Sequence, residues 1–198
     1  NICFSFSEHV NLINEIISPN HLLTDLCANR RRQIKKAINQ GITVRPAENE
    51  QQVESFYAIL SGLYQKKVKK AYPPLSFFLD FFNHCQRNQQ GVILLAFAND
   101  VVIGGIVCPV HEQKVMFEWY VCGLDKEHPH AHPSIMVTWN ALLYACEQGI
   151  QKFDFMGLGK PGIPYGVRDF KLRFGGTIVN YGRYAKDFSN LNLLTSDT

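Results

Sequence analysis

Residues Asp154 to Gly176 read DFMGLGKPGIPYGVRDFKLRFGG, and this stretch carries most of the information about the fold. It joins the strand-like run KFDFMG to a short helix through a loop rich in glycine. The helix is predicted from about Val167 to Phe174, with Val167, Phe170 and Phe174 facing inward. Its first N–H groups point back at the loop, an arrangement that can hold an anion or an oxyanion. The order GLGKPGIPYG matches neither the Walker pattern nor G-x-G-x-x-G, so a nucleotide-binding loop is not predicted.

The predicted helix carries charged residues in two patterns. Asp169 and Arg173 stand four apart with the acid first, a pairing that stabilises a helical turn. Lys171 stands three residues from Arg168 on the same side and close to Tyr165, so its ammonium would lie against an apolar wall beside a second cation. A lysine placed in this way can stabilise an oxyanion, but the residue pattern by itself favours an ordinary solvated lysine.

The rest of the sequence predicts alternating helices and strands. The run ITVRPA reads as a strand. A helix follows at about 51–69 and ends before Pro73 and Pro74. The next helix covers LSFFLDFFNHCQRN, which is apolar nearly all round, so we expect it to be sandwiched. The runs GVILLAFA, VVIGGIVCPV and KVMFEWYVCGL read as an antiparallel meander. A helix from Pro133 to Gln148 precedes KFDFMG, and TIVNYGRYA is a last strand. This order predicts an α/β (α+β) fold in which helices cover one antiparallel-rich central sheet.

A basic amphipathic helix is predicted from Leu22 to Gln40, before the first of these strands. Arg30 points into its apolar arc, where a guanidinium needs a carboxylate or several carbonyl partners, and we expect a structural ion pair there. We interpret residues 1–40 as an N-terminal segment with this connecting helix, and residues 41–198 as the main domain. The side of the helix opposite the apolar arc carries Arg31, Arg32, Lys35 and Lys36.

Composition limits the class of protein. The 198 residues are 46% hydrophobic, and 20 Lys and Arg against 17 Asp and Glu give a net charge of +3, which is too small to indicate a general nucleic-acid binder. Six cysteines lack C-x-x-C spacing and predict small core residues in a reducing compartment, without disulfides or a zinc knuckle. The sequence shows neither a membrane-spanning run nor a signal peptide, so a cytoplasmic protein is predicted. Because the chain begins at Asn1, we expect it to be part of a longer protein.

Five segments resemble, in the same order, the second half of the FemAB-like acyltransferases. They are NRRRQIKKAINQG, LYQKKVKKAYPPLSFF, HPSIMVTWNALLYACEQGIQKFDFMGLGKP, PYGVRDFKLRFGG and YGRY, and they extend over about residues 22–184. Proteins of this type consist of two GNAT-type units and are best known for adding amino acids from aminoacyl-tRNA to the peptide of peptidoglycan precursors. The resemblance implies a GNAT-like domain at 41–198, transfer of an aminoacyl or acyl group to an amine acceptor, and a preceding GNAT-like half.

The resemblance also implies roles for particular residues. The lysine of the run Phe-Lys-x-x-Phe-Gly-Gly, here Lys171, is the suspected catalytic residue of such proteins and would stabilise the tetrahedral oxyanion together with the helix start near Gly166. Relatives place phosphate-contacting cations in the region of residues 66–70. Glu118 stands on the strand that lines the acyl site in GNAT-like folds and is a candidate general base, although an exposed strand glutamate fits the sequence equally. The candidate catalytic residues are therefore Lys171, Glu118 and Tyr165, and the candidate substrate-binding residues are Lys69, Lys70, Tyr72, Arg168, Gly166, Trp119 and Tyr120.

The alternatives differ in the donor. Ordinary GNAT acetyltransferases hold the pyrophosphate of coenzyme A on a glycine-rich turn between the fourth strand and the next helix, whereas that junction here reads GLDKEHPHAHPS. We therefore expect no cofactor and an aminoacyl-tRNA as the donor, with a nucleotide-linked cell-wall precursor among the amine acceptors that the resemblance suggests. Two alternatives stay open. One is an N-acyltransferase that uses an acyl thioester of coenzyme A or of a carrier protein in envelope or polysaccharide modification, and the other is a non-catalytic binding half.

The same junction contains a cluster of metal-binding residue types. Glu127, His128, His130 and His132 lie within six residues, and alternate histidines of an extended loop point the same way. However, no distant fourth ligand suggests itself, and His132 is placed as the helix cap before Pro133. The sequence therefore predicts no metal site in this loop.

Overall fold

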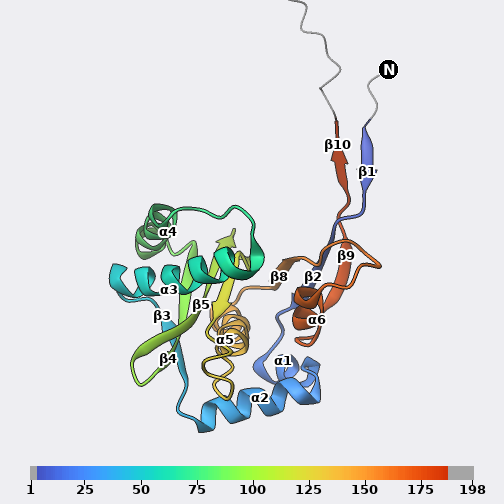
Figure 1. The fold of residues 1–198 in the computed structure, drawn as a ribbon. Coiled ribbons are helices and arrows are strands. Elements are labelled where there is room, and N and C mark those ends of the chain that lie inside the picture. The colour runs from blue at the N-terminus through green and yellow to red at the C-terminus, as the bar shows by residue number, and fades with distance from the viewer. Residues whose placement is uncertain (1–3, 187–198) are drawn as a thin grey trace, which may run out of the picture.

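One mixed sheet of eight strands forms the centre of the molecule (Figure 1). The computed structural model describes residues 4–186. Within them the sheet runs in the order β3-β4-β5-β6-β8-β2-β9, and β7 also pairs with β5. Only β6 and β8 pair in parallel among the described strands, so the predicted antiparallel-rich sheet is confirmed. The strands are β1 (Ser5–Ser7), β2 (Val10–Glu15), β3 (Thr43–Pro46), β4 (Gly91–Ala98), β5 (Val101–His111), β6 (Val115–Phe117), β7 (Tyr120–Gly123), β8 (Lys152–Gly157), β9 (Thr177–Asn180) and β10 (Arg183–Ala185).

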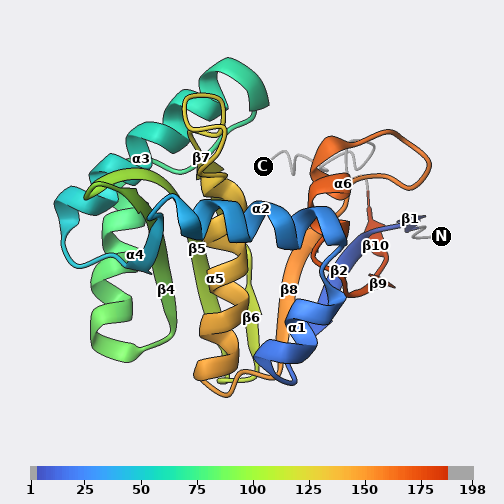
Figure 2. The ribbon, with the colours of Figure 1, turned by 90° about the horizontal axis from the view of Figure 1, so that it is seen from below.

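Helices cover both faces of the sheet, and the predicted α/β (α+β) fold is confirmed. They are α1 (Pro19–Asp25), α2 (Ala28–Asn39), α3 (Glu50–Leu63), the π-helical turn η1 (Tyr64–Val68), α4 (Leu75–Asn88), α5 (Pro133–Glu147) and α6 (Gly166–Leu172). Figure 2 shows α2 crossing α5, with α3 and α4 on the other side of the strands. Strand β4 is buried on both faces, because Val92 and Leu94 join the core under α5 while Ile93 and Leu95 join the core under α3 and α4.

Two of the predicted helices differ from the observed ones. The helix predicted from Leu22 to Gln40 is interrupted, because Leu26 and Cys27 have extended backbone (ψ 137° and 151°) and separate α1 from α2. The expectation that α4 is sandwiched is wrong, since only Phe78 and Phe82 are buried on it. Helix α4 therefore lies on the surface of the sheet, with its remaining aromatic residues partly exposed.

The N-terminal strand β2 was not predicted, although it lies inside the main sheet between β8 and β9. Two of its buried positions are the polar residues Asn11 and Asn14, which hide the apolar alternation of a strand. The first 40 residues thus contribute directly to the sheet, and a domain division at residue 40 stays a prediction. The last predicted strand is also divided, because the chain turns at Tyr181 and Gly182 between β9 and β10.

Strands β1 and β10 form a two-stranded ribbon that projects from the body of the molecule (Figure 1). The rings of Phe6 and Tyr184 lie 5.1 Å apart between centroids, yet the two residues are 55% and 71% exposed. A ribbon of two short strands has almost no core of its own, so it gains little stability without a further surface to pack on.

The cysteines that the structure describes, Cys27, Cys85, Cys108, Cys122 and Cys146, are free thiols. Cys3, for which no disulfide is expected either, lies outside the described residues. In residues 4–186 no helix combines the length and the apolar character needed to cross a membrane.

Candidate active site

The sheet opens into a fork beside Glu118. Strands β6 and β8 pair in parallel up to Phe117 and Asp154, and the N–H of Glu118 then donates to the carbonyl of Asp154 at 2.9 Å. The N–H of the next residue, Trp119, turns away and donates to the carbonyl of Val107 on β5 at 3.0 Å. Beyond this point β7 pairs with β5 while β8 pairs with β2. The strand predicted as one run is therefore broken into β6 and β7, and Glu118 stands where β7 and β8 diverge.

Lys171 reaches the fork from α6. Its Nζ lies 3.1 Å from Oε1 of Glu118 and also donates to the carbonyl of Phe155 on β8. The two side chains of the pair are only 7% and 2% exposed, so water screens their attraction far less than at the surface. An ammonium has three N–H donors, and the contacts described here use two of them. The interpretations of Lys171 as a solvated lysine and of Glu118 as an exposed strand residue are therefore wrong.

The carboxyl of Glu118 lies in an electrostatic environment with opposing influences. Burial raises its pKa above the ordinary value, the charge of Lys171 lowers it, and the nearby Asp154 raises it again, with a net increase. The second carboxylate oxygen, Oε2, is buried and has no hydrogen-bond partner among residues 4–186. A buried acceptor without a partner costs about 1–3 kcal/mol, so it needs an explanation in a functional context.

Strand β2 supports the fork with two asparagine side chains. The amide of Asn11 donates to both carboxylate oxygens of Asp154, at 3.1 Å each. Asp154 in turn accepts the N–H of Met156 at 2.6 Å, and Met156 has a left-handed backbone (φ +62°) that turns the end of β8. The amide of Asn14 donates to the carbonyl of Phe174 at 3.1 Å. The N-terminal strand thus fixes both the end of β8 and the residues that follow α6.

Arg30 holds α6 from the side of α2. Its guanidinium donates to the carbonyl of Phe170 at 2.9 Å and lies over the rings of Phe170 and Phe174, 4.7 and 4.5 Å from their centroids. Burial lowers the pKa of Arg30 to about 10, which leaves it charged at neutral pH. The ion pair expected for Arg30 is not found in the described part of the chain, because a carbonyl and two aromatic faces take the place of a carboxylate. Since Phe170 directly precedes Lys171, Arg30 also positions the lysine.

Arg168 is occupied by the glycine-rich loop. Its Nε donates to the carbonyl of Leu158 at 2.9 Å, and its two terminal nitrogens donate to the carbonyls of Ile163, at 3.0 Å, and of Lys160. These contacts use the guanidinium to tie the loop to α6. The geometry therefore makes Arg168 a residue that shapes the loop rather than one that faces a substrate.

Tyr165 stands at the start of α6 and is 38% exposed. Its ring packs over Gly159, where φ is +72° and a Cβ atom would come within 2.9 Å of the ring. Gly166, in contrast, has no neighbouring atom within 4 Å of such a Cβ position. The loop therefore requires glycine at 159, whereas a side chain at 166 would meet no neighbouring atom.

A connected aromatic surface lies on the other side of the fork, over α4, η1 and β7. Trp119 is 43% exposed and stacks on Phe77 at 6.0 Å. The ring of Tyr64 lies 6.4 Å from that of Tyr120 and 4.9 Å from that of Tyr72. Burial, followed by the proximity of Tyr120 and of Tyr165, raises the pKa of Tyr64. Tyr165, which directly precedes α6, thus contributes to the electrostatic environment of Tyr64.

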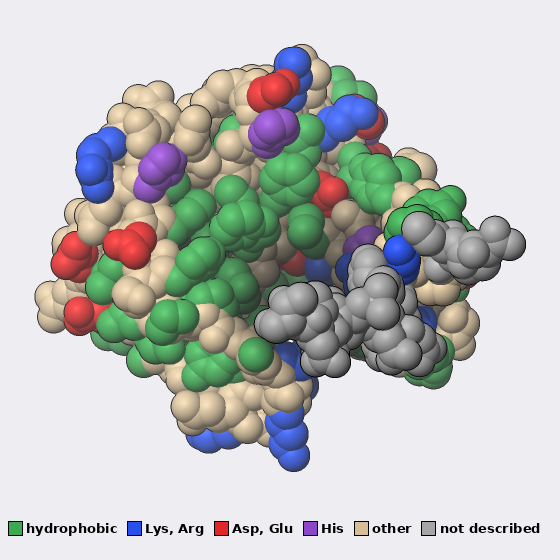
Figure 3. Space-filling view, turned by 90° about the horizontal axis from the view of Figure 1, so that it is seen from above, with side chains coloured by type: hydrophobic (Ala, Val, Ile, Leu, Met, Phe, Trp, Pro, Cys, Tyr) green, Lys and Arg blue, Asp and Glu red, His purple; other side chains and the backbone are tan. Residues whose placement is uncertain are grey.

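Lys69 and Lys70 follow η1 at the margin of this aromatic surface. Lys69 has a left-handed backbone (φ +53°) and ends the helical turn, and both lysine side chains are exposed. Tyr72 anchors the segment through a 2.8 Å hydrogen bond between its hydroxyl and that of Ser61. On the face that Figure 3 shows, hydrophobic side chains occupy the middle and Lys and Arg side chains lie towards the margins.

An acidic side chain occupies the N-terminus of α5. Asp125 accepts the N–H of Ser134 at 3.3 Å and also the Ser134 hydroxyl. His132 stands at the predicted cap position, but its side chain makes no capping hydrogen bond, so Asp125 has that role instead. In the part of the chain that the structure describes, no three His, Cys, Asp or Glu side chains lie close enough together to hold a metal ion.

The fork also contains residues that sequence reasoning missed. Asn11, Asn14 and Asp154 are buried polar residues, and Asp154 could have been suspected because it is the single acid in the apolar run KFDFMG. The two asparagines had no comparable signal, since their partners lie more than a hundred residues away in sequence. Lys171 and Glu118 were named separately, and only the structure brings them together.

The fold is that of an acyltransferase domain of the GNAT type. A family model described as acetyltransferase (GNAT) domain matches residues 26–172, and the chain belongs to this family. No curated protein sequence matches the chain.

Three solved structures are similar in fold. FemX has a TM-score of 0.73 at 13% identity, over 85% of this chain and 59% of that one. L-PGS from Bacillus licheniformis has a TM-score of 0.67 at 11% identity, over 95% of this chain and 63% of that one. The C-terminal domain of a putative lysylphosphatidylglycerol synthetase from Agrobacterium fabrum has a TM-score of 0.62 at 11% identity, over 91% of this chain and 60% of that one. The chain thus spans less than two thirds of each of these structures, and at such identities the likeness concerns the fold alone.

Proposed function

We propose that this chain is the catalytic half of an aminoacyltransferase, which moves an aminoacyl group from an ester donor to an amine acceptor at the fork between β7 and β8. The observation that carries the proposal is the buried pair of Lys171 and Glu118 at the point where the sheet opens. Burying two charges is expensive, and apolar residues of the same volume would often stabilise a core better. A buried acid with a raised pKa beside a lysine at such an opening is therefore better explained by chemistry than by folding.

The proposed reaction forms one C–N bond and breaks one C–O bond. The amine lone pair attacks the ester carbonyl carbon, and the carbonyl oxygen becomes an oxyanion that accepts the remaining N–H of Lys171. The unpartnered Oε2 of Glu118 takes the proton that the amine loses, for which the raised pKa of this carboxyl is suited. Collapse of the tetrahedral intermediate expels the donor's hydroxyl oxygen, which receives that proton. Tyr165, at the start of α6, contacts the donor beside Lys171, and Arg168 contributes through the loop that it holds.

The surface beside the fork favours an aminoacyl-tRNA as the donor. Its single-stranded 3′ end offers bases that stack on aromatic side chains such as Trp119 and Tyr120, and phosphates that Lys69 and Lys70 attract. Coenzyme A is disfavoured, because the carboxylate of Asp125 occupies the helix N-terminus at which GNAT acetyltransferases hold the pyrophosphate. A pyrophosphate there would meet a negative charge where it needs free N–H groups.

The proposal extends to the context of the chain. The projecting β1–β10 ribbon, with Phe6 and Tyr184 exposed, supports a preceding GNAT-like half that packs on it, as does the fact that the chain spans only part of the similar structures. We place the reaction in the cytoplasm, where charged tRNA is available. The acceptor we favour is the peptide amine of a nucleotide-linked cell-wall precursor.

The test uses the intact protein, a mixture of tRNAs charged with radiolabelled amino acids, and a uridine-nucleotide-linked pentapeptide precursor. We expect label to enter the precursor in an alkali-stable amide, and Lys171→Met to abolish this transfer. Lys160→Met, which changes an exposed lysine of the glycine-rich loop before α6, serves as the matched control and keeps the activity. Efficient transfer from acetyl-coenzyme A together with inert aminoacyl-tRNA would overturn the donor assignment, and label on phosphatidylglycerol vesicles instead of the precursor would overturn the acceptor.

A further inference from the structure

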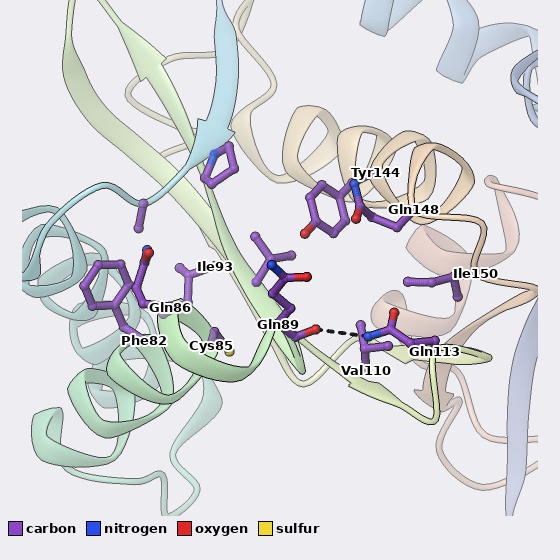
Figure 4. A pocket seen from close by; sticks show the side chains of 14 residues that line it. Phe82, Cys85, Gln86, Gln89, Ile93, Val110, Gln113, Tyr144, Gln148 and Ile150 are labelled. Atoms are coloured by element: carbon purple, nitrogen blue, oxygen red, sulfur yellow. Dashed lines mark hydrogen bonds between the residues drawn. The ribbon is translucent and has the colours of Figure 1, made fainter.

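A second site lies at the edge of the sheet, apart from the fork. A cavity of about 390 Å³ is located where β4 begins, between the C-terminal ends of α4 and α5 (Figure 4). Its floor is apolar and includes the buried side chains of Phe82, Ile93 and Ile150. None of the residues that line it belongs to the fork, so the proposed transfer reaction does not account for it.

The edge of the sheet is only partly covered at this cavity. Strand β3 pairs with β4 only up to Pro46, opposite Leu94, and a proline has no N–H with which to continue the ladder. The last contact between the two segments is the hydrogen bond from the N–H of Ala47 to the carbonyl of Ile93, at 2.8 Å. Strand β4 begins at Gly91, two residues before Ile93, and Gly91 lines the cavity.

The backbone of Gly91 faces this uncovered edge. In an antiparallel ladder, alternate residues direct their N–H and C=O groups to opposite neighbours. The carbonyl of Ile93 faces β3, because it accepts from Ala47, whereas the carbonyl of Gln90 faces β5 and accepts the N–H of Val110 at 2.9 Å. Gly91, two residues before Ile93, therefore points its N–H and C=O towards the cavity. A sheet edge with available N–H and C=O groups is a template for one more strand.

The lining of the cavity has apolar walls and a polar rim, and it carries no formal charge. Its lining, all within the described residues, contains no Lys, Arg, Asp or Glu. Burial raises the pKa of the Cys85 thiol to about 11 and raises the pKa of the Tyr144 phenol, so both are neutral at physiological pH. The rim is formed by amide side chains, which hydrogen-bond to uncharged polar groups, namely Gln86, Gln89, Gln113 and Gln148.

We propose that this cavity binds a short, extended and uncharged peptide segment of a partner protein, as an additional strand on the edge of β4. The peptide backbone pairs with the N–H and C=O of Gly91. Successive side chains of a strand point to opposite sides, so one enters the wall formed by Phe82 and Ile93 below α4, and the next enters the wall formed by Tyr144 and Ile150 at α5. The main-chain pairing supplies affinity, and the two apolar walls with their amide rim select uncharged side chains.

The experiment is a display selection of random heptapeptides on the intact protein, followed by binding measurements on an enriched sequence made as an acetylated amide. We expect Gln86→Trp and Cys85→Trp, which fill the cavity from α4, to weaken binding by about tenfold or more. Gln86 is exposed, so Gln86→Trp does not disturb the core. This variant therefore still tests the cavity if Cys85→Trp fails to fold. Arg87→Trp places the same ring on the same helix outside the cavity and serves as the matched control, with unchanged binding.

Two further measurements identify the mode of binding. Methylation of the peptide amide that pairs with Gly91 removes a hydrogen-bond donor but keeps the side chains, and is expected to abolish binding. Bound peptide is expected to slow hydrogen exchange in residues 89–94. The proposal is overturned if no sequence is enriched above a blank support, if binding survives methylation at every peptide amide, or if the two cavity-filling variants bind as the wild type does. None of these readouts uses the transfer reaction, so they stand or fall independently of it.

Discussion

Nζ of Lys171 and Oε1 of Glu118 lie 3.1 Å apart inside the protein, although one belongs to α6 and the other to the break between β6 and β7. Each charge is compensated mainly by the other. Removing one partner of such a pair leaves an uncompensated buried charge, which typically costs about 3–5 kcal/mol, whereas removing both costs much less. This relationship makes stability and catalysis separable by experiment.

Lys171→Met is expected to reduce transfer by a factor on the order of 10²–10³, because an oxyanion donor is lost, and to lower the free energy of unfolding by about 3 kcal/mol. Adding Glu118→Gln is expected to restore most of that stability but no activity. Urea unfolding and transfer rates of the two single variants and the double variant provide the comparison. Equal stability of Lys171→Met and the wild type would show that the pair is not coupled as described.

The stability of the Lys171→Met variant is expected to depend on pH. Burial already raises the pKa of Glu118 above its ordinary 4.5, and loss of the lysine charge raises it further. A carboxyl with a raised pKa in the folded state binds its proton more tightly there than in the unfolded chain, so protonation favours folding. Its contribution is fully present below pH 4.5 and is lost as the pH rises through the folded pKa. Relative to the wild type, the free energy of unfolding should therefore fall as the pH rises above 4.5, and Glu118→Gln should remove this slope. If the difference in the free energy of unfolding between Lys171→Met and the wild type does not change with pH, this prediction is contradicted.

Arg30→Met is expected to lower the free energy of unfolding by about 2 kcal/mol, because the carbonyl of Phe170 loses its donor inside the protein. Since Phe170 precedes Lys171, kcat is expected to fall while KM changes little. Arg30→Lys keeps the charge but not the planar donor group, so its free energy of unfolding and its kcat should lie between those of the wild type and Arg30→Met. Arg32→Met, on the exposed side of α2, is the control. A stability loss with unchanged kcat would limit Arg30 to a purely structural role.

Gly176→Ala is expected to destabilise the protein by about 3 kcal/mol, because a Cβ atom at φ +97° would come within 2.0 Å of Oδ1 of Asn14 and 2.7 Å of the carbonyl of Ile13. Gly166→Ala, in open space at the start of α6, should stay within about 0.5 kcal/mol of the wild type. Thermal unfolding of both variants measures the contrast. Similar midpoints for the two would mean that β2 does not approach the end of α6 as closely as described.

Replacing both Lys69 and Lys70 by Ala is expected to weaken tRNA binding and to reduce the slope of log K against log salt concentration by about 1.4, or 0.7 for each phosphate contact to a single strand. Lys35→Ala with Lys36→Ala removes the same charge from α2 and should leave the slope nearly unchanged. Binding titrations at several salt concentrations measure both. The same slope change in the two double variants would indicate general attraction of a polyanion rather than contacts beside the fork.

Much of the fold could be predicted because its elements are locally encoded. The apolar run of β4, Pro133 at the start of α5 and the strand KFDFMG each have a pattern that is readable within a few residues. The fork could not be predicted in this way. Lys171 looks solvated in its own helix, and it is buried only because Glu118 and the carbonyl of Phe155 meet it from other elements.

The polar residues of the core were hidden for a related reason. Asn11 and Asn14 interrupt the apolar alternation that would reveal β2, and their partners are supplied by the far end of the chain. Arg30 shows the same limit, because a helical wheel places it in the core but does not reveal that a carbonyl and two rings, instead of a carboxylate, receive it.

The position of β2 between β8 and β9 has a consequence for the order of assembly during synthesis. The ribosome releases β2 before β8 and β9, the two strands that pair with it, because these emerge only with residues 152–180. Pairing between segments so distant in sequence is slow, and an unpaired strand can meanwhile join the wrong neighbour. Asn11 cannot hold Asp154 until both strands are present, so the fork between β7 and β8 is completed late in synthesis. A half-synthesised domain therefore lacks the buried Lys171–Glu118 pair on which the proposed transfer depends.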